Sequence, residues 1–283
     1  MERTIKKFWP VFVVPTLAAF IIGFVWPFLQ GLYLSFCKFI TIDKADWNGL
    51  RNYVFALTDG DFLHSFWFTA LFTVVSTLCI NLAAFAIALA LTRSIKGTNL
   101  FRSIFFMPNL IGGIVLGYIW NILLNCVLTL LGKPLLSLHA PYGFAGLVIL
   151  MCWQQIGYMM IIYIAGLQSI PNDYLEAARI DGASSRQILW RIKIPNVMPS
   201  ITICLFLSLT NGFKLFDQNL ALTGGDPAHA TEMLALNIYQ TFYGRSGPQW
   251  KGYGQAKAVL FCILVIVISV IQLRATRSKE VQQ

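Results

Sequence analysis

The chain has 283 residues, of which 57% are hydrophobic and only 12% are charged. Soluble globular proteins carry about 25% charged residues, so this composition excludes an ordinary soluble domain. The net charge of +9 indicates membrane topology rather than nucleic-acid binding, because the Lys and Arg residues lie at the ends of apolar segments and not along one face.

The apolar residues are collected into long runs, and about 20 such residues are enough for a helix to span a bilayer. We therefore predict an all-α membrane protein with a single domain over residues 1–283. Its six transmembrane helices are expected at about residues 8–36, 62–91, 105–124, 143–166, 197–215 and 255–273.

The first run follows a basic start, as a signal peptide would. Its apolar part is about twice the length of a signal-peptide core, so we predict a retained transmembrane helix. Residues 125–142 are expected to form a loop with a short re-entrant or interfacial piece, and residues 216–254 a polar loop.

The charges of the loops predict the orientation, because Lys and Arg accumulate on the cytoplasmic side. One side carries thirteen of them: Arg3, Lys6, Lys7, Arg93, Lys96, Arg102, Arg179, Arg186, Arg191, Lys193, Arg274, Arg277 and Lys279. The other side carries seven: Lys38, Lys44, Arg51, Lys133, Arg245, Lys251 and Lys257. Both termini are therefore expected in the cytoplasm.

The cysteines and histidines give no sign of a metal site or a disulfide framework, because no C-x-x-C or Cys/His cluster occurs. The six cysteines, Cys37, Cys79, Cys126, Cys152, Cys204 and Cys262, are scattered along the chain. We expect them to be small buried hydrophobic residues.

A polar island at residues 170–195 separates the fourth and fifth apolar runs, and it predicts two short helices with a break between them. Pro171 suits a first helical turn, and Asp181–Gly182 is a turn pair. Ser184–Ser185 can cap a second helix, which Pro195 is expected to stop. A broken helix pair of this kind fits into a partner protein, although an ordinary connector is the alternative.

This island resembles the signature loop of ABC importer permeases. The shared pattern is Glu-Ala-Ala, three residues, Gly, nine residues and Ile-x-Leu-Pro, with Ile194 here at the Leu position. The resemblance implies that the loop docks into a groove of a cytoplasmic ATPase, that Glu176 pairs with a cation there, and that Gly182 permits the bend. The residues expected to couple to the ATPase are Glu176, Ala177, Ala178, Asp181, Gly182 and Pro195.

Polar residues inside the apolar runs are costly and usually functional. The fourth run carries Gln154, Gln155 and Tyr158, and the fifth ends with Asn211 and Lys214, followed by Asp217. We expect them to line a pathway for a hydroxyl-rich solute. The alternatives are that Lys214 and Asp217 form an interfacial pair, that the Gln and Tyr residues hold helices together, and that Lys257 either faces the same cavity or anchors the outer interface.

The segment after the fifth run resembles the carbohydrate branch of the same permeases, in its first-subunit type, as in the larger maltose permease subunit. The pattern is Phe-Asp-x-x-x-x-Leu-Thr-Gly-Gly-x-Pro over residues 216–227, with Asp226 where many relatives have Gly. The stretches at 105–108 and 273–277 fit as well. By position, the resemblance points to Lys214 and Leu215 as substrate-binding residues, with Asn211, Gln155 and Tyr158 nearby.

The resemblance also implies the partners: a second permease subunit of similar fold, two ATPase subunits, an extracytoplasmic solute-binding protein and a sugar. ATP and Mg²⁺ would bind the ATPase, and this chain would be a non-catalytic subunit without a cofactor in a bacterial or archaeal cytoplasmic membrane. A permease for glycerol phosphate or another polyol ester is the alternative. A secondary transporter is disfavoured because no inverted repeat or intramembrane carboxylate is evident.

Overall fold

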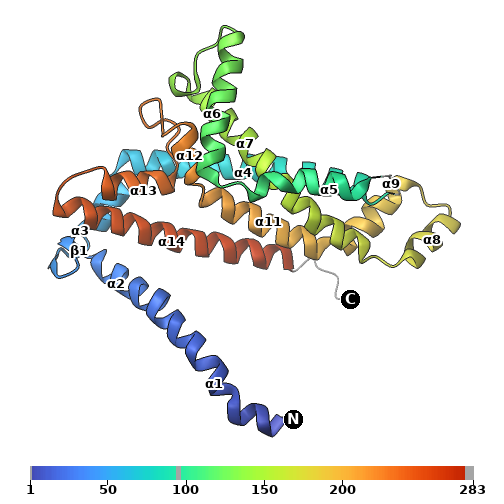
Figure 1. Ribbon diagram of the computed structural model, residues 1–283, viewed down its shortest axis with the longest axis horizontal. Coiled ribbons are helices and arrows are strands. Elements are labelled where there is room, and N and C mark those ends of the chain that lie inside the picture. Colours follow the sequence, from blue (N-terminus) through green and yellow to red (C-terminus); the bar gives the residue numbers. More distant parts are fainter. Residues whose placement is uncertain (1, 94–96, 278–283) are drawn as a thin grey trace. The chain divides into compact units, whose positions relative to one another are not determined.

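The computed structural model describes residues 2–93 and 97–277, and these are almost entirely helical (Figure 1). Lys96 and Lys279, counted above, lie outside the described residues. Five of the described helices are long and apolar enough to cross a membrane, and a pair of helices bent by 68° gives a sixth when the pair is counted as one span. This agrees with the six transmembrane helices predicted from the sequence.

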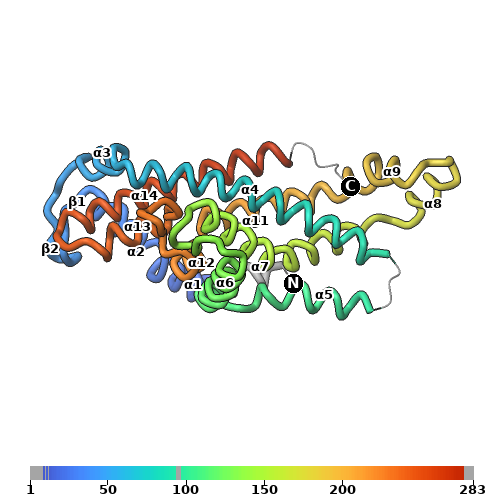
Figure 2. Tube along the Cα trace, turned by 90° about the horizontal axis from the view of Figure 1, so that it is seen from above, coloured from blue at the N-terminus to red at the C-terminus, as the bar shows by residue number. Residues whose placement is uncertain are grey.

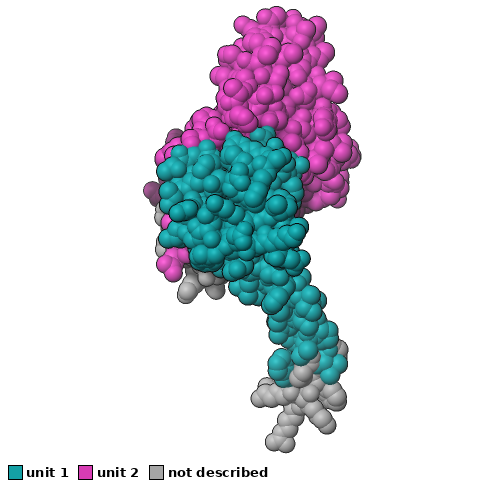
Figure 3. Space-filling view, turned by 90° about the vertical axis from the view of Figure 1, so that its left-hand side faces the viewer, with its two compact units in different colours: residues 1–59, 238–262 teal, residues 60–237, 263–283 magenta. Residues whose placement is uncertain are grey.

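Two compact units make up the chain, coloured separately in Figure 3. Unit 1 comprises residues 1–59 and 238–262, and unit 2 comprises residues 60–237 and 263–283. Each unit is described by itself.

Unit 1 begins with one long helix made of three parts, α1 (Glu2–Phe20), a π-helical turn (Ile21–Val25) and α2 (Trp26–Leu34). The wide turn lies directly before Pro27. Because a proline removes one helical hydrogen bond and its ring collides with the carbonyl four residues earlier, a wider turn at this point relieves the clash without ending the helix.

The segment after α2 forms an antiparallel hairpin and a short helix, β1 (Cys37–Thr41), β2 (Lys44–Trp47) and α3 (Arg51–Thr58). Asn52 fastens α3 to the start of the hairpin. Its buried amide donates hydrogen bonds to the carbonyls of Ser35 (2.8 Å) and Cys37 (2.9 Å). Residues 37–58 therefore form a folded segment.

The stretch expected as a polar loop at 216–254 is also largely helical. It contains α12 (Asp217–Leu222), α13 (Leu234–Tyr243) and the beginning of α14 (Pro248–Arg277). Each of the two short helices buries one face, through Leu222 in α12 and Leu236 in α13. Polar residues lie between these apolar positions. The stretch is therefore polar on average and was predicted to be a loop, although it contains two amphipathic helices.

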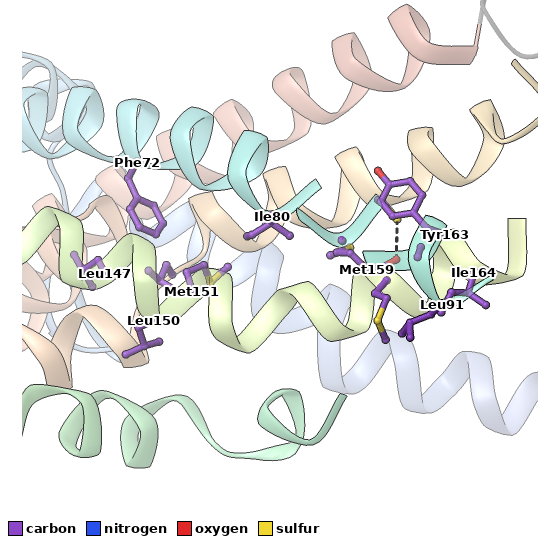
Figure 4. Close-up of a cluster of buried hydrophobic side chains, with 14 of the residues drawn as sticks. Phe72, Ile80, Leu91, Leu147, Leu150, Met151, Met159, Tyr163 and Ile164 are labelled. Atoms are coloured by element: carbon purple, nitrogen blue, oxygen red, sulfur yellow. Dashed lines mark hydrogen bonds between the residues drawn. The ribbon is translucent and has the colours of Figure 1, made fainter. Parts of the chain in front are cut away.

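Unit 2 is built on three long helices that lie side by side, α4 (Gly60–Leu91), α7 (Ala140–Gln168) and α11 (Met198–Phe213) (Figures 1 and 2). Buried apolar side chains fill the space between them. Phe72 and Ile80 of α4 and Leu150, Met151 and Met159 of α7 belong to this core (Figure 4).

The third transmembrane helix differs from the expected range of 105–124. The structure has α5 (Thr98–Phe106), a 3₁₀ turn (Met107–Leu110) and then α6 (Gly113–Leu130). Pro108 and the extended backbone at Ile111 and Gly112 separate α5 from α6, so the transmembrane helix starts later and ends later than predicted. The loop expected at 125–142 is correspondingly shorter, with a 3₁₀ turn at Leu136–Leu138.

The polar island forms α8 (Asn172–Ile180), α9 (Ser185–Ile188), a π-helical turn (Leu189–Lys193) and α10 (Ile194–Asn196). Pro195 was expected to stop the second helix, and the helix indeed ends one residue later, at Asn196. As at Pro27, a wide turn precedes the proline, and the helix continues to Asn196 before it bends into α11.

The cysteines are not uniformly buried, as had been expected. Cys37 and Cys204 are buried, whereas Cys79 and Cys126 are exposed. Both exposed thiols lie on apolar transmembrane helices, α4 and α6, whose outer faces are not covered by this chain.

Candidate functional site

A cavity of about 270 Å³ lies in unit 2, where α11 ends and α12 begins. Eight residues line it: Met151, Gln155, Asn211, Lys214, Leu215, Phe216, Asp217 and Gln218. The structure thus brings together five of the seven residues that the sequence placed on the substrate pathway.

The end of α11 explains why these side chains converge. The helix stops at Phe213, Lys214 occupies its C-cap, and α12 begins three residues later at Asp217. Lys214 and Asp217 therefore lie on either side of a break, and the turn of the chain between the two helices directs both toward the cavity.

Two glycines of α6 allow α12 to lie close to this helix. A Cβ atom at Gly113 would meet the side chains of Asp217 and Gln218, and one at Gly117 would meet Ala221. Glycine is therefore required at both positions for the backbone of α6 to pass directly behind the cavity wall.

The polar groups of the cavity are three amides, one ammonium group and one carboxylate. The Asn211 amide donates to Gln155 Oε1 at 3.3 Å. Lys214 and Asp217 are both exposed, and neither forms an ion pair within residues 2–93 and 97–277. The cavity therefore offers several hydrogen-bond donors and acceptors with no net charge from its two ionisable residues.

Gln154 and Tyr158, the other two residues expected along the pathway, are not among the residues that line this cavity. Gln154 is buried behind it, accepts a hydrogen bond from the Gln218 amide (2.7 Å) and donates one to the Ile111 carbonyl (3.2 Å). Tyr158 packs against the hydrophobic core. Gln154 is thus a positioning residue that joins a cavity side chain to the break between α5 and α6.

Sequence reasoning missed Gln218, Met151 and Phe216 as lining residues. Gln218 follows Asp217 directly and carries the same type of polar group as the residues that were selected. Met151 and Phe216 gave no signal, because an apolar residue in an apolar segment is equally suited to the core.

Sequence reasoning also missed a buried hydrogen-bond network in unit 2, formed by Asn81, Ser208 and Tyr163. The Asn81 amide donates to Ser208 Oγ (2.8 Å), and the Tyr163 hydroxyl donates to Asn81 Oδ1 (2.7 Å). These contacts join α4, α11 and α7. An asparagine in the middle of an apolar helix was the available signal.

Helix α8 presents an unusually exposed surface. Ile180 is 86% exposed and Tyr174 is 55% exposed. Glu176 is exposed as well and has no hydrogen-bond or ion-pair partner in the part of the chain that the structure describes. An exposed surface that combines apolar side chains with the unpaired carboxylate of Glu176 is suited to a partner protein that supplies a cation.

The turn after α8 depends on Gly182, whose φ of +77° lies in the left-handed region. A capping box then starts α9, in which Ser184 and Gln187 each accept a hydrogen bond from the other's backbone N–H. The expected turn and cap are both present. A hollow of about 260 Å³ follows, lined by Asp181, Gly182, Ala183, Gln187, Arg191 and Ile192.

The segment between α12 and α13 is organised by Asn219, which donates to the Thr231 carbonyl (2.8 Å) and accepts from the Met233 N–H (3.0 Å). This arrangement buries Glu232, whose Oε2 lies 2.8 Å from His229 Nδ1. Burial raises the pKa of Glu232 above its ordinary value of 4.5, although His229 and Asn237 act in the opposite direction.

Lys257 lies in unit 1 and is almost completely buried. Its ammonium contacts Asp59 Oδ2 at 2.6 Å and Thr241 Oγ1 at 2.8 Å. From the sequence, Lys257 was considered either as a residue facing the cavity or as an anchor at the outer interface. The structure shows neither role, because Lys257 forms an internal ion pair.

Comparison with known proteins relates this architecture to membrane transport. Residues 9–279 match the family described as "Binding-protein-dependent transport system inner membrane component". The match covers almost the whole chain, including the cavity and the α8–α10 segment.

Two curated relatives align along nearly their full length. The chain is 43% identical to the probable starch degradation products transport system permease protein AmyD of Thermoanaerobacterium thermosulfurigenes, over 96% of this chain and 94% of the relative. It is 29% identical to the sn-glycerol-3-phosphate transport system permease protein UgpA of Brucella abortus biovar 1 (strain 9-941), over 95% and 94%.

A solved structure shares the fold. It is a chain from the crystal structure of a bacterial ABC transporter involved in the import of the acidic polysaccharide alginate, with a TM-score of 0.81. The two chains are 20% identical, and the alignment covers 98% of each.

Proposed function

The chain belongs to the family of inner membrane components of binding-protein-dependent transport systems, and we propose that it forms one half of the pathway of an ATP-driven sugar importer. In this proposal a second permease subunit of similar fold supplies the other half. An extracytoplasmic solute-binding protein delivers the sugar, and two ATPase subunits drive its passage.

The observation that carries the proposal is the composition of the cavity at the α11–α12 break. Gln155, Asn211 and Gln218 offer amide groups, and Asp217 offers a carboxylate. Sugar hydroxyls both donate and accept hydrogen bonds, so a wall of amides and a carboxylate can satisfy them. The volume of about 270 Å³ lies near the lower end of small-molecule pockets, which suits one or two sugar rings at a time.

The second part of the proposal concerns the ATPase. The exposed face of α8 fits an apolar groove, and the unpaired carboxylate of Glu176 fits a cation at its edge. After the turn at Gly182, the α9–α10 segment continues through one bend of 68° into α11, which ends at the cavity. Movement of the loop by the ATPase would therefore reach the cavity through a single helix.

This chain is proposed to be non-catalytic, with ATP and Mg²⁺ bound by the ATPase subunits. The α8–α10 segment and both termini are proposed to lie in the cytoplasm, because the side that carries them has thirteen Lys and Arg residues and the other side seven.

A glycerol phosphate permease is the second candidate, and the 29% identical relative named for that solute supports it. The cavity disfavours it, because Asp217 places a carboxylate beside the one cation, Lys214. A phosphate monoester carries up to two negative charges at neutral pH and would be repelled by that carboxylate.

The test is purification of the tagged complex from native membranes, followed by uptake in proteoliposomes with ATP inside and the solute-binding protein outside. We expect the tagged chain to bring down a second permease and an ATPase. Uptake of a labelled maltooligosaccharide should be supported, whereas glycerol 3-phosphate should not compete. Uptake that needs an ion gradient and survives removal of the ATPase would instead establish a secondary transporter.

Asp217→Asn and Lys214→Gln separate the two substrates. If the solute is a neutral sugar, both variants should weaken uptake by a similar factor, because each replaces a charged hydrogen-bonding group by a neutral amide that forms weaker hydrogen bonds. If the solute is a phosphate ester, Asp217→Asn should improve uptake and Lys214→Gln should abolish it.

A further inference from the structure

The short helix α3 of unit 1 presents a stripe of exposed apolar side chains. Leu50 at its N-cap, Val54 and Leu57 follow one another at spacings of four and three residues, so they lie on one face of the helix. Their exposed fractions are 66%, 60% and 57%. Neighbouring apolar side chains that stay exposed on one face indicate a surface that meets a membrane or another protein.

The opposite face of α3 packs against the beginning of α14. Three residue pairs of unit 1 make this contact: Asn52 with Gly252, Phe55 with Tyr253, and Asp59, directly after the helix, with Lys257. The two rings stack with their centroids 4.0 Å apart, and a Cβ atom at Gly252 would lie 2.8 Å from the Asn52 amide nitrogen. Helix α3 therefore runs along the first turns of α14, and its apolar stripe faces away from that helix.

The contacts with α14 place α3 at a boundary of the membrane. Between Lys257 and Arg274 lie sixteen residues without a charged side chain. They span about 24 Å as a helix, somewhat less than the hydrocarbon core of about 30 Å. Lys257 therefore lies near one membrane boundary and Arg274 near the other. Because Asp59 forms an ion pair with Lys257, the end of α3 lies at the same depth as Lys257.

The chain before α3 confirms that this segment stays close to the membrane. The membrane-spanning helix Val13–Leu34 ends only two residues before the hairpin begins at Cys37. The buried amide of Asn52 binds the Cys37 carbonyl, so α3 is fastened to the point where the chain leaves the membrane. Both ends of α3 are thus held next to a membrane-spanning helix.

Two side chains beside the apolar stripe are suited to the headgroup region. Trp47, three residues before Leu50, is exposed and stacks on Phe36 with the ring centroids 5.5 Å apart. Tryptophan is enriched at membrane–water interfaces, because its ring is apolar and its N–H needs a polar partner. Arg51 is exposed and forms no ion pair within residues 2–93 and 97–277. A guanidinium group at this depth can reach lipid phosphates.

We propose that the face of α3 formed by Leu50, Val54 and Leu57 inserts among the lipids of the extracytoplasmic leaflet. Helix α3 then acts as an interfacial helix, with its apolar stripe at the boundary between the headgroups and the acyl chains. It holds the start of α14 at a fixed depth through the ion pair of Asp59 and Lys257. The choice of leaflet rests on the orientation given under the proposed function.

Lipid fits this surface better than a protein does. A solute-binding protein has to leave after each delivery, and the three apolar side chains would then return to water in every cycle, which is unfavourable. A second permease subunit that covered the stripe would have to supply a carboxylate for the neighbouring Arg51. Every phospholipid carries a phosphate that can accept hydrogen bonds from this guanidinium group.

The experiment measures which solvent surrounds a nitroxide label on α3. The label is attached to Val54→Cys or Leu57→Cys, in a chain whose four cysteines that are not buried are replaced by alanine. The complete transporter is reconstituted into vesicles of phosphatidylethanolamine and phosphatidylglycerol. Collisions of the label with oxygen, which concentrates among acyl chains, are compared with collisions with a neutral, water-soluble nickel complex. Asp43→Cys, at the exposed turn of the hairpin, is the matched control in water.

We expect the ratio of oxygen collisions to nickel collisions to be several-fold higher at Val54→Cys and Leu57→Cys than at Asp43→Cys. Equal ratios at the test and control positions would overturn the proposal, because the stripe would then lie in water. Low collision rates with both reagents would also overturn it, because a protein would then cover the stripe. Addition of the solute-binding protein identifies that protein: rates that fall only after its addition indicate the binding protein, and rates that are low without it indicate the second permease.

The label measurement requires only that the chain is inserted in a bilayer. Failure of the chain to purify with a second permease and an ATPase would overturn the proposed function and leave the collision ratios interpretable. A low ratio at both test positions in an active importer would overturn the lipid contact and leave the proposed function intact.

Discussion

The ammonium of Lys257 lies 2.6 Å from a carboxylate oxygen of Asp59, 198 residues earlier in the chain. Only 1% of the Lys257 side chain and 12% of the Asp59 side chain is exposed. The same ammonium contacts Thr241 Oγ1. One buried cation thus joins the end of α3, helix α13 and helix α14 within unit 1.

Lys257→Met should lower the free energy of unfolding by about 3–5 kcal/mol, because loss of one partner leaves the other charge buried without compensation. Thermal unfolding of the detergent-solubilised protein measures this. Lys251→Met is the control: its ammonium donates to the Ile40 carbonyl at an exposed position, and its loss should cost less than about 1 kcal/mol. If both variants lower the free energy of unfolding equally, burial does not make the Lys257–Asp59 ion pair more important than the exposed hydrogen bond of Lys251.

Gly182→Val should uncouple ATP hydrolysis from transport while the chain remains inserted. Its φ of +77° is strained for a β-branched residue, although the space around it is open. Gly182→Asn is the matched variant, because asparagine adopts left-handed angles at lower cost and should retain most of the coupling. Sugar-stimulated ATPase activity in proteoliposomes distinguishes the two. Similar activity of both variants would argue against a conformational requirement.

Asn81→Leu should destabilise unit 2 by about 1–2 kcal/mol, because it leaves Tyr163 and Ser208 without their shared partner inside a bundle of apolar helices. Tyr163→Phe removes only one of these hydrogen bonds and should cost less. Chemical unfolding followed by tryptophan fluorescence would measure both. If Tyr163→Phe lowers the free energy of unfolding more than Asn81→Leu does, Asn81 is not the central residue of this hydrogen-bond network.

Gln154→Leu should weaken sugar binding without any direct contact with the sugar, because Gln218 loses the acceptor that holds its amide. We expect a five- to tenfold loss, about 1–1.5 kcal/mol, typical of one hydrogen bond. Gln154→Glu keeps an acceptor at the same position and should restore most of the binding. Equilibrium binding of a labelled sugar to the detergent-solubilised complex would measure the loss in each variant.

The Glu232 carboxyl should make the stability of unit 2 depend on pH. Its pKa is raised in the folded state, so the folded protein holds this proton more tightly than the unfolded chain does. The contribution of this group to stability is therefore fully present below pH 4.5 and decreases as the pH rises through the folded-state pKa. Glu232→Gln should flatten that part of the profile in thermal unfolding between pH 4.5 and 7. An unchanged slope would show that Glu232 does not titrate in this range.

Sequence alone predicted the features that depend on local chemistry. Apolar runs predicted the transmembrane helices, since a backbone in lipid must satisfy its own hydrogen bonds. The turn at Gly182 and the cap at Ser184 followed from residue types that suit those conformations. The wide turn before Pro195 could not be foreseen, because a helix can either end at a proline or widen before it.

The tertiary structure alone determined which polar residues meet. Gln154 and Gln155 are adjacent in the sequence, yet Gln155 lines the cavity and Gln154 lies behind it, bonded to Gln218. Lys257 could not be assigned from the sequence, because its partner Asp59 comes from a distant segment. Local sequence patterns indicate where the long apolar helices lie, whereas the packing of the helices determines which side chains are buried, paired or open to a solute.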